Sequence, residues 1–320
     1  MTAAAKAQLV KDLGRQIGFD LVGITVPAPA AGAAYYRRWL AAGYAARMHY
    51  LAQNVRIREQ PALLLPGARS VICVAVNYKR SDGYERSPAT PPRHPTGPMG
   101  RIAQYARGRD YHLVLREMLH TLVERLRLHL HEPFEARCFV DTGPVLEREL
   151  AAAAGLGWIG RNTCLINAQL GSYVLLGEVI TTLELAPDSP VPARCGTCTR
   201  CLDRCPTQAL VAPHTLDASR CIAYLTIEHR AEIPANLHRS LGSWLFGCDE
   251  CQQVCPYNAR APLGTCSGLT EDRVPAWLPV APLVELSSSD YRRLTRDTAL
   301  CRATRRMWQR TARLVLNNAG

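Results

Sequence analysis

The sequence between residues 195 and 206 reads Cys195-Gly-Thr-Cys198-Thr-Arg-Cys201-Leu-Asp-Arg-Cys205-Pro206. This is the C-x2-C-x2-C-x3-C-P run that holds iron–sulfur clusters in bacterial ferredoxins. Three cysteines at this spacing wrap one [4Fe–4S] cubane, and the fourth, followed by proline, reaches a second cubane. The stretch therefore predicts a two-cluster, ferredoxin-like domain within the chain.

A second run lies downstream, Cys248-Asp-Glu-Cys251-Gln-Gln-Val-Cys255-Pro256, with one cysteine fewer. Cys221 is the candidate for the missing ligand, which makes two sites of four thiolates each. The alternative is a pair of structural zinc sites, although zinc ribbons rarely carry four cysteines in one such run. The crossed pattern assigns one cluster to Cys195, Cys198, Cys201 and Cys255, and the other to Cys205, Cys221, Cys248 and Cys251.

The composition suits a cytoplasmic protein that binds a polyanion. The chain has 320 residues, 48% of them apolar, and a formal charge of +11. No stretch approaches the ~18 apolar residues of a membrane span, and the N-terminus shows neither a secretory nor a twin-arginine pattern. In the cytoplasm, 13 cysteines indicate metal or redox chemistry rather than disulfides. Five of them are expected to be non-ligands: Cys73, Cys138, Cys164, Cys266 and Cys301.

Hydrophobic periodicity predicts alternating helices and strands ahead of the cysteine runs. This alternation indicates an α/β layer in residues 1–185, followed by a two-cluster domain in 186–262 and a basic helical segment in 263–320. Residues 81–100 are proline-rich and are expected to form a loop. Helices are expected at 4–17, 31–42, 112–130 and 144–154, with a helical tail at 287–318, and strands at 20–25, 70–77, 136–140 and 174–183.

The segment Gly155-Leu-Gly157-Trp-Ile-Gly160 matches the G-x-G-x-x-G pattern of dinucleotide-binding proteins. In those proteins the pattern follows a strand and opens a helix. Here it follows the helix expected at 144–154 and precedes a strand-like stretch at 163–166. We therefore expect these glycines to permit a close backbone approach or a tight turn instead of binding a nucleotide.

Six further segments resemble one family, the epoxyqueuosine reductases. With the cysteine runs they extend the resemblance over roughly residues 5–318. The segments are Tyr105-Ala-Arg-Gly-Arg-Asp-Tyr-His112, Val140-Asp-Thr-Gly-Pro144, Gly155-Leu-Gly-Trp-Ile-Gly-Arg-Asn162, Leu216-Asp217, Arg220-Cys-Ile-Ala-Tyr-Leu-Thr-Ile-Glu228 and Gly247-Cys-Asp-Glu-Cys251.

The resemblance implies an oxidoreductase that converts epoxyqueuosine to queuosine at the tRNA wobble position. This last step of queuosine synthesis takes two electrons and two protons and releases the epoxide oxygen as water. The family fold is α+β: a nitroreductase- or reductive-dehalogenase-like α/β domain, a two-[4Fe–4S] ferredoxin-like domain and a short C-terminal helical tail. The first domain binds base-off cobalamin, which we expect to face the first cluster and to receive electrons through both clusters.

Asp141 is the expected proton donor, because it lies just past a strand, where α/β folds place ligand chemistry. A carboxyl acid at neutral pH needs a raised pKa, which burial beside a corrin would give. The alternative role for Asp141 is to cap the helix that follows it.

The resemblance also implies further residues that contact cobalamin. For each of them the alternative is an ordinary role on the surface or in the core. His112 is expected to be a helix-start residue lining the pocket, because Asp110-Tyr-His112 lacks the glycine of the D-x-H-x-x-G cobalamin motif. The implied contacts are Arg58, Asp141, Leu165, Ser172, Leu176, Tyr224 and Asp249.

The partners expected are tRNA and an external electron donor such as flavodoxin or ferredoxin, with no membrane and a monomeric chain. Arginines in the tail and Arg37-Arg38 are candidate phosphate contacts, since counterion release favours a polyanion. Two other functions compete with this one: a cobalamin-dependent reductase of a small molecule, like a reductive dehalogenase, and a plain electron-transfer ferredoxin. A plain electron-transfer ferredoxin would leave the first 185 residues without a role.

Overall fold

The computed structural model describes residues 1–81 and 97–319. The first half of the chain forms a four-stranded sheet whose order is β1-β2-β7-β4. The strands are Leu21–Thr25 (β1), Ser70–Asn77 (β2), Ala136–Phe139 (β4) and Val174–Thr181 (β7). All four strands were expected from the sequence, within about two residues of their observed ends.

Every pairing in this sheet is antiparallel. The sheet is therefore not a parallel layer, in which ligands bind at the carboxyl ends of the strands. Asp141 was placed at a site because it follows a strand of such a layer, and this reason was wrong. Antiparallel pairing allows each face of the sheet to be covered by different helices, and here both faces are covered. The residues after β4 still form the candidate site, for reasons of packing described below.

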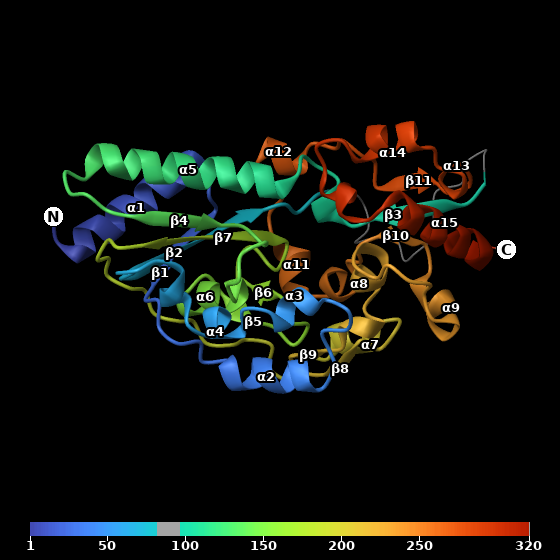
Figure 1. Ribbon diagram of the computed structural model, residues 1–320, viewed down its shortest axis with the longest axis horizontal. Helices are drawn as coiled ribbons and strands as arrows, with labels where there is room; N and C mark the ends of the chain where they lie inside the picture. Colours follow the sequence, from blue (N-terminus) through green and yellow to red (C-terminus); the bar gives the residue numbers. More distant parts are fainter. Residues whose placement is uncertain (82–96, 320) are drawn as a thin grey trace.

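Helices cover the two faces of the sheet with separate cores (Figure 1). Ala3–Ile17 (α1) and Tyr111–His129 (α5) pack on one face, where Leu115, Leu119 and Leu122 are fully buried. Glu147–Ala153 (α6) packs on the other face beneath β1, β2 and β7. The helix expected at 144–154 begins three residues late, because the chain turns at Asp141, whose φ is +54°.

Short elements complete the N-terminal half. Trp158–Ile159 (β5) and Leu165–Ile166 (β6) form an antiparallel hairpin directly after α6. Most of the loop expected at 81–100 lies outside the described residues, and its end, Met99–Ile102, is strand β3. The remaining elements are Ala33–Ala41 (α2), His49–Ala52 (α3), Val55–Glu59 (α4), and the 3-10 turns Pro61–Leu64 (η1) and Gln104–Ala106 (η2).

The cysteine-rich segment folds into short helices and turns. Its elements are Arg200–Arg204 (α7), Leu210–Ala212 (β8), Thr215–Leu216 (β9), Ala218–Arg220 (η3), Ile222–Ile227 (α8), Ala235–Leu237 (η4), His238–Leu241 (α9), Trp244–Phe246 (β10), Glu250–Gln253 (α10) and Pro256–Arg260 (α11). The C-terminal elements are Ser267–Thr270 (α12), Trp277–Pro279 (β11), Ala281–Val284 (α13), Ser288–Thr295 (α14), Ala299–Arg302 (η5) and Arg305–Ala319 (α15).

A second sheet, ordered β10-β3-β11, joins segments that are far apart in sequence. β3 comes from the N-terminal half, β10 from the cysteine-rich segment and β11 from the C-terminal segment. Trp308 of α15 stacks on Phe246 of β10, with 5.7 Å between ring centroids. The three predicted regions thus meet at this sheet, and the chain termini lie at opposite ends of the long axis (Figure 1).

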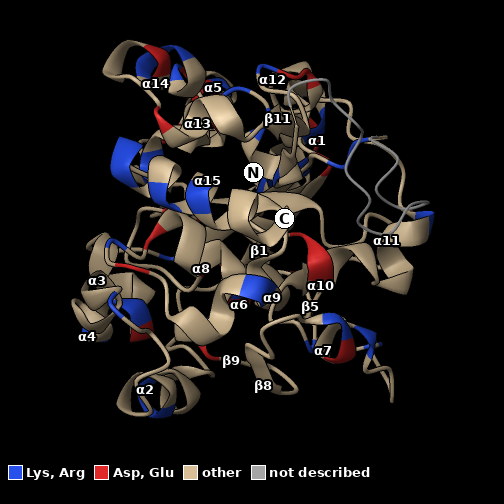
Figure 2. Ribbon diagram, turned by 90° about the vertical axis from the view of Figure 1, so that its right-hand side faces the viewer, with Lys and Arg blue, Asp and Glu red and all other residues tan. Residues whose placement is uncertain are grey.

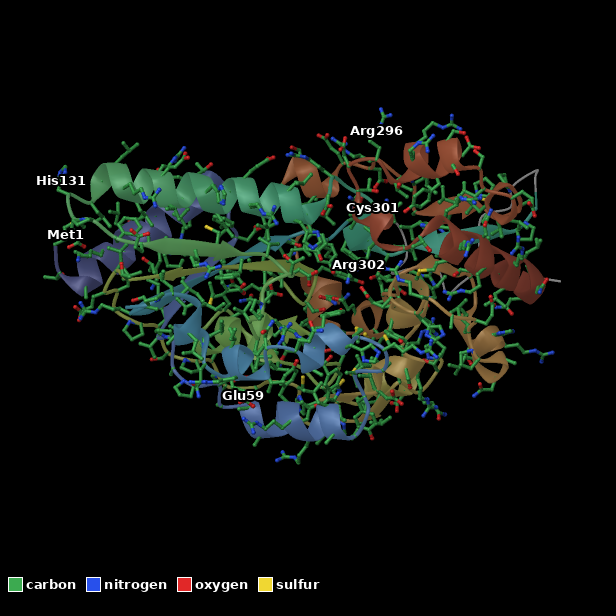
Figure 3. The ribbon with its side chains drawn as sticks, viewed as in Figure 1. Met1, Glu59, His131, Arg296, Cys301 and Arg302 are labelled. Carbon is green, nitrogen blue, oxygen red and sulfur yellow. The ribbon has the colours of Figure 1, made fainter. Side chains whose placement is uncertain are left out.

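The expected helical tail is three elements, α14, η5 and α15, and its arginines differ in their surroundings. Arg310 is buried and donates hydrogen bonds to the carbonyls of Leu225 and His229, each at 2.6 Å. Figure 2 shows further basic positions along α14 and α15, and Figure 3 shows Arg296 projecting from the surface. Arg292, Arg296 and Arg306 are exposed and have no acidic partner within the described part of the chain.

No helix in the described ranges has both the length and the apolar character needed to cross a bilayer.

Candidate functional site

The four cysteines assigned to the first cluster line one cavity. This cavity measures about 320 Å³ and is bordered by Cys195, Cys198, Cys201 and Cys255. Four arginines line it as well, namely Arg161, Arg194, Arg200 and Arg260. A cubane held by four thiolates carries net negative charge, so thiols combined with arginines are a fitting lining for a [4Fe–4S] cluster.

The cysteines assigned to the second cluster are neighbours of one another in a buried region. Burial raises the pKa of the Cys248 thiol well above its usual value, and the adjacent Cys221 raises it further. Burial and Cys205 likewise raise the pKa of Cys221. Cys251 is influenced by both Cys248 and Cys221. That these four residues bind one cluster, as the crossed spacing predicts, stays a prediction.

The G-x-G-x-x-G segment runs from the end of α6 into the β5–β6 hairpin beside the first cavity, so it does not open a helix as the dinucleotide-binding pattern does. A Cβ on Gly157 would lie 2.3 Å from the carbonyl oxygen of Ile166, so only glycine allows this close approach. The hairpin presents Trp158, whose Nε1 donates a hydrogen bond to the Sγ of Cys195 at 3.4 Å. The expectation of a close backbone approach is confirmed.

Asp141 lies in the turn between β4 and α6, in a left-handed backbone conformation. Its backbone N–H donates to Oε1 of Glu147 at 2.5 Å, which fixes the turn. The carboxylate of Asp141 faces α5, where its Oδ2 is 3.2 Å from Nε2 of His112 and where the nearby Tyr111 acts to lower its pKa. α6 has Leu146 at its N-cap and no side-chain cap, so Asp141 does not cap this helix.

His112 lies between two carboxylates. Its Nδ1 is 2.7 Å from Oδ1 of Asp110, the N-cap residue of α5, and its Nε2 faces Asp141. Burial alone would lower the pKa of His112, but the hydrogen bonds to Asp110 and Asp141 raise it to about 9. At neutral pH the imidazole is therefore protonated, and the Asp110–His112–Asp141 array holds one exchangeable proton.

The pKa of Asp141 differs from the sequence-based expectation. Burial acts to raise it, but the hydrogen bond and charge of His112 outweigh burial and hold the pKa below its usual value. The chain by itself therefore does not raise this pKa, and no local pattern in the sequence indicates that an imidazolium contacts this carboxylate. Its side chain is 57% exposed, so the carboxylate remains accessible.

Tyr50 of α3 and Arg302 of η5 lie near Asp141 at the more exposed side of the array. The charge of Arg302 acts on Asp141 and on Tyr50, whose ring centroid lies 5.9 Å from the guanidinium carbon. Arg302 is held by Glu228, with Nε donating to Oε1 at 2.7 Å. Figure 3 shows Arg302 near the centre of the molecule. Tyr50 is 42% exposed, so this aromatic face is available to a ligand.

The second cluster's segment lies nearer to Asp141 than the sequence suggested. Tyr105, which is in edge contact with Tyr111, is influenced by both Asp141 and Asp249. Asp249 follows Cys248 directly and accepts a hydrogen bond from the N–H of Gln104 at 2.8 Å. The Cys248 segment thus packs against residues 104–111 beside Asp141, and the expectation that cobalamin faces the first cluster stays a prediction.

The other predicted cobalamin contacts occupy three kinds of position. Ser172 joins the sheet to the cysteine-rich segment, with its Oγ donating to Gln252 at 2.9 Å. Tyr224 is buried and accepts a hydrogen bond from the N–H of Arg47 at 3.1 Å. Leu165 and Leu176 belong to the core beneath α6. Whether these residues contact cobalamin stays a prediction.

Arg58 of α4 has an incomplete set of partners. Its Nη1 donates to the carbonyl of Val145 at 3.4 Å, while its Nε is buried and has no hydrogen-bond partner in the described residues. A buried donor without an acceptor is costly, so Arg58 is suited to contact a polar group of a bound cofactor.

The chain matches two family models. Residues 58–142 match "Epoxyqueuosine reductase QueG, DUF1730", and residues 194–258 match the "4Fe-4S double cluster binding domain". A protein of Xanthomonas campestris named epoxyqueuosine reductase is 43% identical over 316 residues, which are 98% of this chain and 87% of that protein.

The chain belongs to the epoxyqueuosine reductase family.

Other relatives and solved structures agree with this assignment. The Escherichia coli epoxyqueuosine reductase is 38% identical, with 98% of this chain and 81% of that protein covered. The Gloeobacter violaceus enzyme is 41% identical and is covered over 98% of its length. A crystal structure of an epoxyqueuosine reductase with a tRNA-Tyr stem loop carrying epoxyqueuosine has a TM-score of 0.87 and 31% identity. It covers 98% of this chain and 82% of that chain.

Membership of the epoxyqueuosine reductase family confirms the predicted family, the α+β fold and the two iron–sulfur clusters. It also decides against zinc sites, a plain ferredoxin and a reductase of small organohalides. Sequence reasoning missed Tyr111, Glu147 and Glu178, which lie around or behind Asp141. It also missed that Cys164, expected to be a non-ligand, is close enough to Cys251 for each thiol to shift the pKa of the other. Only Tyr111 carried a signal, since it lies in a segment shared with the family.

Proposed function

We propose that this chain reduces epoxyqueuosine to queuosine in tRNA, with Asp141 delivering a proton to the departing epoxide oxygen. The observation that carries the proposal is the Asp110–His112–Asp141 array beside the second cluster's cysteine segment. The array supports the proposal because it would hold an exchangeable proton near a centre that is expected to receive electrons. An epoxide deoxygenation requires both.

The residues present fit the cofactors of the family. The four-thiol, four-arginine cavity and the buried group of Cys205, Cys221, Cys248 and Cys251 suit two [4Fe–4S] clusters. Arg58, with its unpartnered Nε, together with Ser172 and Asp249 would contact base-off cobalamin. When bound, the clusters and cobalamin supply the two electrons that the reaction consumes.

The chain's own residues control the proton. Asp110 fixes the orientation of the His112 ring, so that the proton on Nε2 points at Asp141. Asp141 passes this proton to the substrate oxygen, and the nearby Tyr111, which acts to lower the pKa of Asp141, stabilises the carboxylate left behind. The positive φ of Asp141 aims its side chain toward α5 instead of into the α6 core.

The partners follow from exposed charge and aromatic surface. Tyr50 and Arg302, beside Asp141, would stack on the wobble base and contact its phosphate. The exposed Arg38, Arg292, Arg296 and Arg306 would contact tRNA phosphates, whereas Arg37 is engaged by Glu59. We further propose a monomer that acts in the cytoplasm and takes electrons from a flavodoxin or ferredoxin. The donor would bind at the arginine-lined first cavity.

Anaerobic turnover tests this function. The protein is loaded with iron–sulfur clusters and cobalamin, reduced chemically and supplied with tRNA that carries epoxyqueuosine, and nucleosides are quantified by mass spectrometry. The wild type is expected to form queuosine, and Asp141→Asn is expected to be slower by at least roughly a hundredfold. Asp12→Asn, at an exposed position on α1, serves as the matched control and should equal the wild type. No queuosine from fully loaded wild type would contradict the proposal.

A further inference from the structure

Glu250 is a buried acid inside the second cysteine run, residues 248–255. Its side chain is 7% exposed, and both of its carboxyl oxygens accept hydrogen bonds. Oε1 accepts from Nη1 of Arg101 at 2.9 Å and from Nε1 of Trp244 at 3.2 Å, and Oε2 accepts from Nε of Arg204 at 2.7 Å. The carboxylate is therefore fixed by three donors, two of which are cations.

The two arginines reach Glu250 from different parts of the fold. Arg204 is the last residue of α7 and directly precedes Cys205, a candidate ligand of the second cluster. Arg101 belongs to β3 of the second sheet, and its guanidinium carbon lies 4.1 Å from the ring centroid of Trp244 on β10. Glu250 thus joins both cysteine runs to this sheet, and we call Arg101, Glu250 and Arg204 the Glu250 ion triad.

Fold stability does not by itself account for the Glu250 ion triad. Removing ionised groups from water is costly, and their mutual attraction often only offsets that cost, so apolar side chains of similar shape would serve as well. The side chain of Arg101 is 4% exposed, beside the 7% of Glu250. Charge at this place in the fold therefore calls for a second explanation, and the neighbouring thiols supply one.

The charges of the triad lie beside candidate ligands of the second cluster. Glu250 directly precedes Cys251, as Arg204 directly precedes Cys205. Burial is the largest cause that raises the pKa of the Cys248 thiol, and the charge of Glu250 raises it further. A negative charge that disfavours a thiolate also disfavours the additional electron of a reduced cluster, whereas a guanidinium favours that electron.

We propose that the Glu250 ion triad sets the reduction potential of the second cluster. This inference rests on the proposed function, in which electrons from a donor protein pass through both clusters. Arg101 and Arg204 stabilise the negative charge that reduction adds, and Glu250 opposes it while it holds both arginines in place. Two guanidinium groups outnumber one carboxylate, so the triad as a whole favours the passage of electrons from the first cluster to the second. No bond or proton is involved in this step.

Redox titration of the loaded protein in the absence of tRNA, followed by electron paramagnetic resonance of the clusters, tests this role. Arg204→Gln removes a positive charge, so the ratio of reduced to oxidised second cluster at a fixed potential should fall roughly tenfold. Glu250→Gln removes the negative charge but can still accept a hydrogen bond, so the same ratio should rise roughly tenfold. The two variants thus shift the reduction potential in opposite directions, by about 59 mV for a one-electron couple.

Two controls separate charge from structure in this titration. Arg204→Lys retains the positive charge and should keep the wild-type potential. Arg69→Gln breaks an Arg–Glu pair of similar length, 2.6 Å to Glu184, at an exposed place beside β2, and should change neither cluster. The redox step that is absent from Cys248→Ser identifies the second cluster.

Unshifted potentials in Arg204→Gln and Glu250→Gln, at wild-type iron content, would overturn the proposal and leave the triad with a structural role. Shifts of the same sign, or loss of the clusters from Arg204→Gln, would overturn it as well. Should Glu250→Gln lose its clusters, Arg204→Gln still decides the sign, because that side chain is 42% exposed and its replacement disturbs packing less. Since the titration uses no tRNA, a wild type that forms no queuosine contradicts the proposed function and leaves this measurement valid.

Discussion

The first-cluster cavity and the acid site at Asp141 are built from opposite charges. The cavity is bordered by four thiols and four arginines, three of which are exposed, Arg194, Arg200 and Arg260. The acid site gathers four carboxyl groups around one imidazolium: those of Asp110, Asp141, Glu147 and Glu178. The difference supports the proposal that electrons enter at the basic face of the first cavity and that the proton comes from the acidic region at Asp141. On this account, electron entry and proton delivery can be altered separately.

Removing a ligand of the second cluster should have the largest effect on activity. On this account, electrons pass through that cluster from the first-cluster cavity to the acid site at Asp141. Cys248→Ser is expected to lose the absorbance of one cluster and all queuosine formation. Cys301→Ser, at an exposed cysteine outside both ligand sets, is the matched control and should retain both. Iron quantification and visible absorbance measure the first property, and nucleoside analysis measures the second. Full activity in Cys248→Ser would contradict the ligand assignment.

Removing the imidazolium should have the next largest effect. His112→Gln retains a hydrogen-bonding side chain but cannot hold the proton between Asp110 and Asp141, so turnover should fall by roughly a hundredfold. The wild type should lose activity as pH rises through about 9, where His112 loses its proton. This alkaline limb should be missing in His112→Gln. An unchanged limb would show that another group carries the proton.

The protonated imidazole of His112 should also stabilise the folded chain. The pKa of His112 is raised from 6.5 to about 9 in the folded chain, so its contribution is complete below pH 6.5 and is lost as pH rises through about 9. The melting temperature of the wild type should therefore decline more steeply between pH 6.5 and 9 than that of His112→Gln. Thermal melts in this window measure the difference, and parallel slopes would contradict the raised pKa.

Reversing charge at the first cavity should affect only the protein electron donor. Arg194→Glu combined with Arg200→Glu is expected to slow reduction by flavodoxin or ferredoxin roughly tenfold at low salt. The rate with a small chemical reductant should not change. A control that reverses Arg292 and Arg296 on the tail should weaken tRNA binding without slowing the donor. Equal slowing with both reductants would place electron entry elsewhere.

The smallest effect is expected from Trp158→Phe, which removes the hydrogen bond to the Sγ of Cys195. A hydrogen bond to a cluster thiolate stabilises the reduced, more negative state. The variant should therefore have a lower reduction potential at one cluster, measured by redox titration, with turnover close to that of the wild type. An unchanged potential would indicate that no cluster is bound at Cys195.

The two regions also differ in how much of them the sequence could predict. The candidate cluster ligands could be named from local spacing, because cubane geometry fixes the intervals between cysteines, and Cys195, Cys198, Cys201 and Cys255 line one cavity in the structure. The strand carrying Glu178 was predicted, but its pairing was not, because β1, β2, β7 and β4 are separated by long connections. The acid site joins α5, the turn after β4, α6 and β7, so its charges meet only after tertiary packing. For this reason the lowered pKa of Asp141 could not be foreseen.

The separation of electron entry from proton delivery is tested most directly by observing both in one sample. Cluster-replete, cobalamin-loaded Asp141→Asn is mixed anaerobically with a reduced donor protein and tRNA carrying epoxyqueuosine. Cluster reduction is followed by absorbance, and queuosine is quantified in the same sample by mass spectrometry. The account predicts that the clusters are reduced at the wild-type rate and that almost no queuosine forms. Clusters that fail to be reduced, or queuosine formed at the wild-type rate, would contradict it.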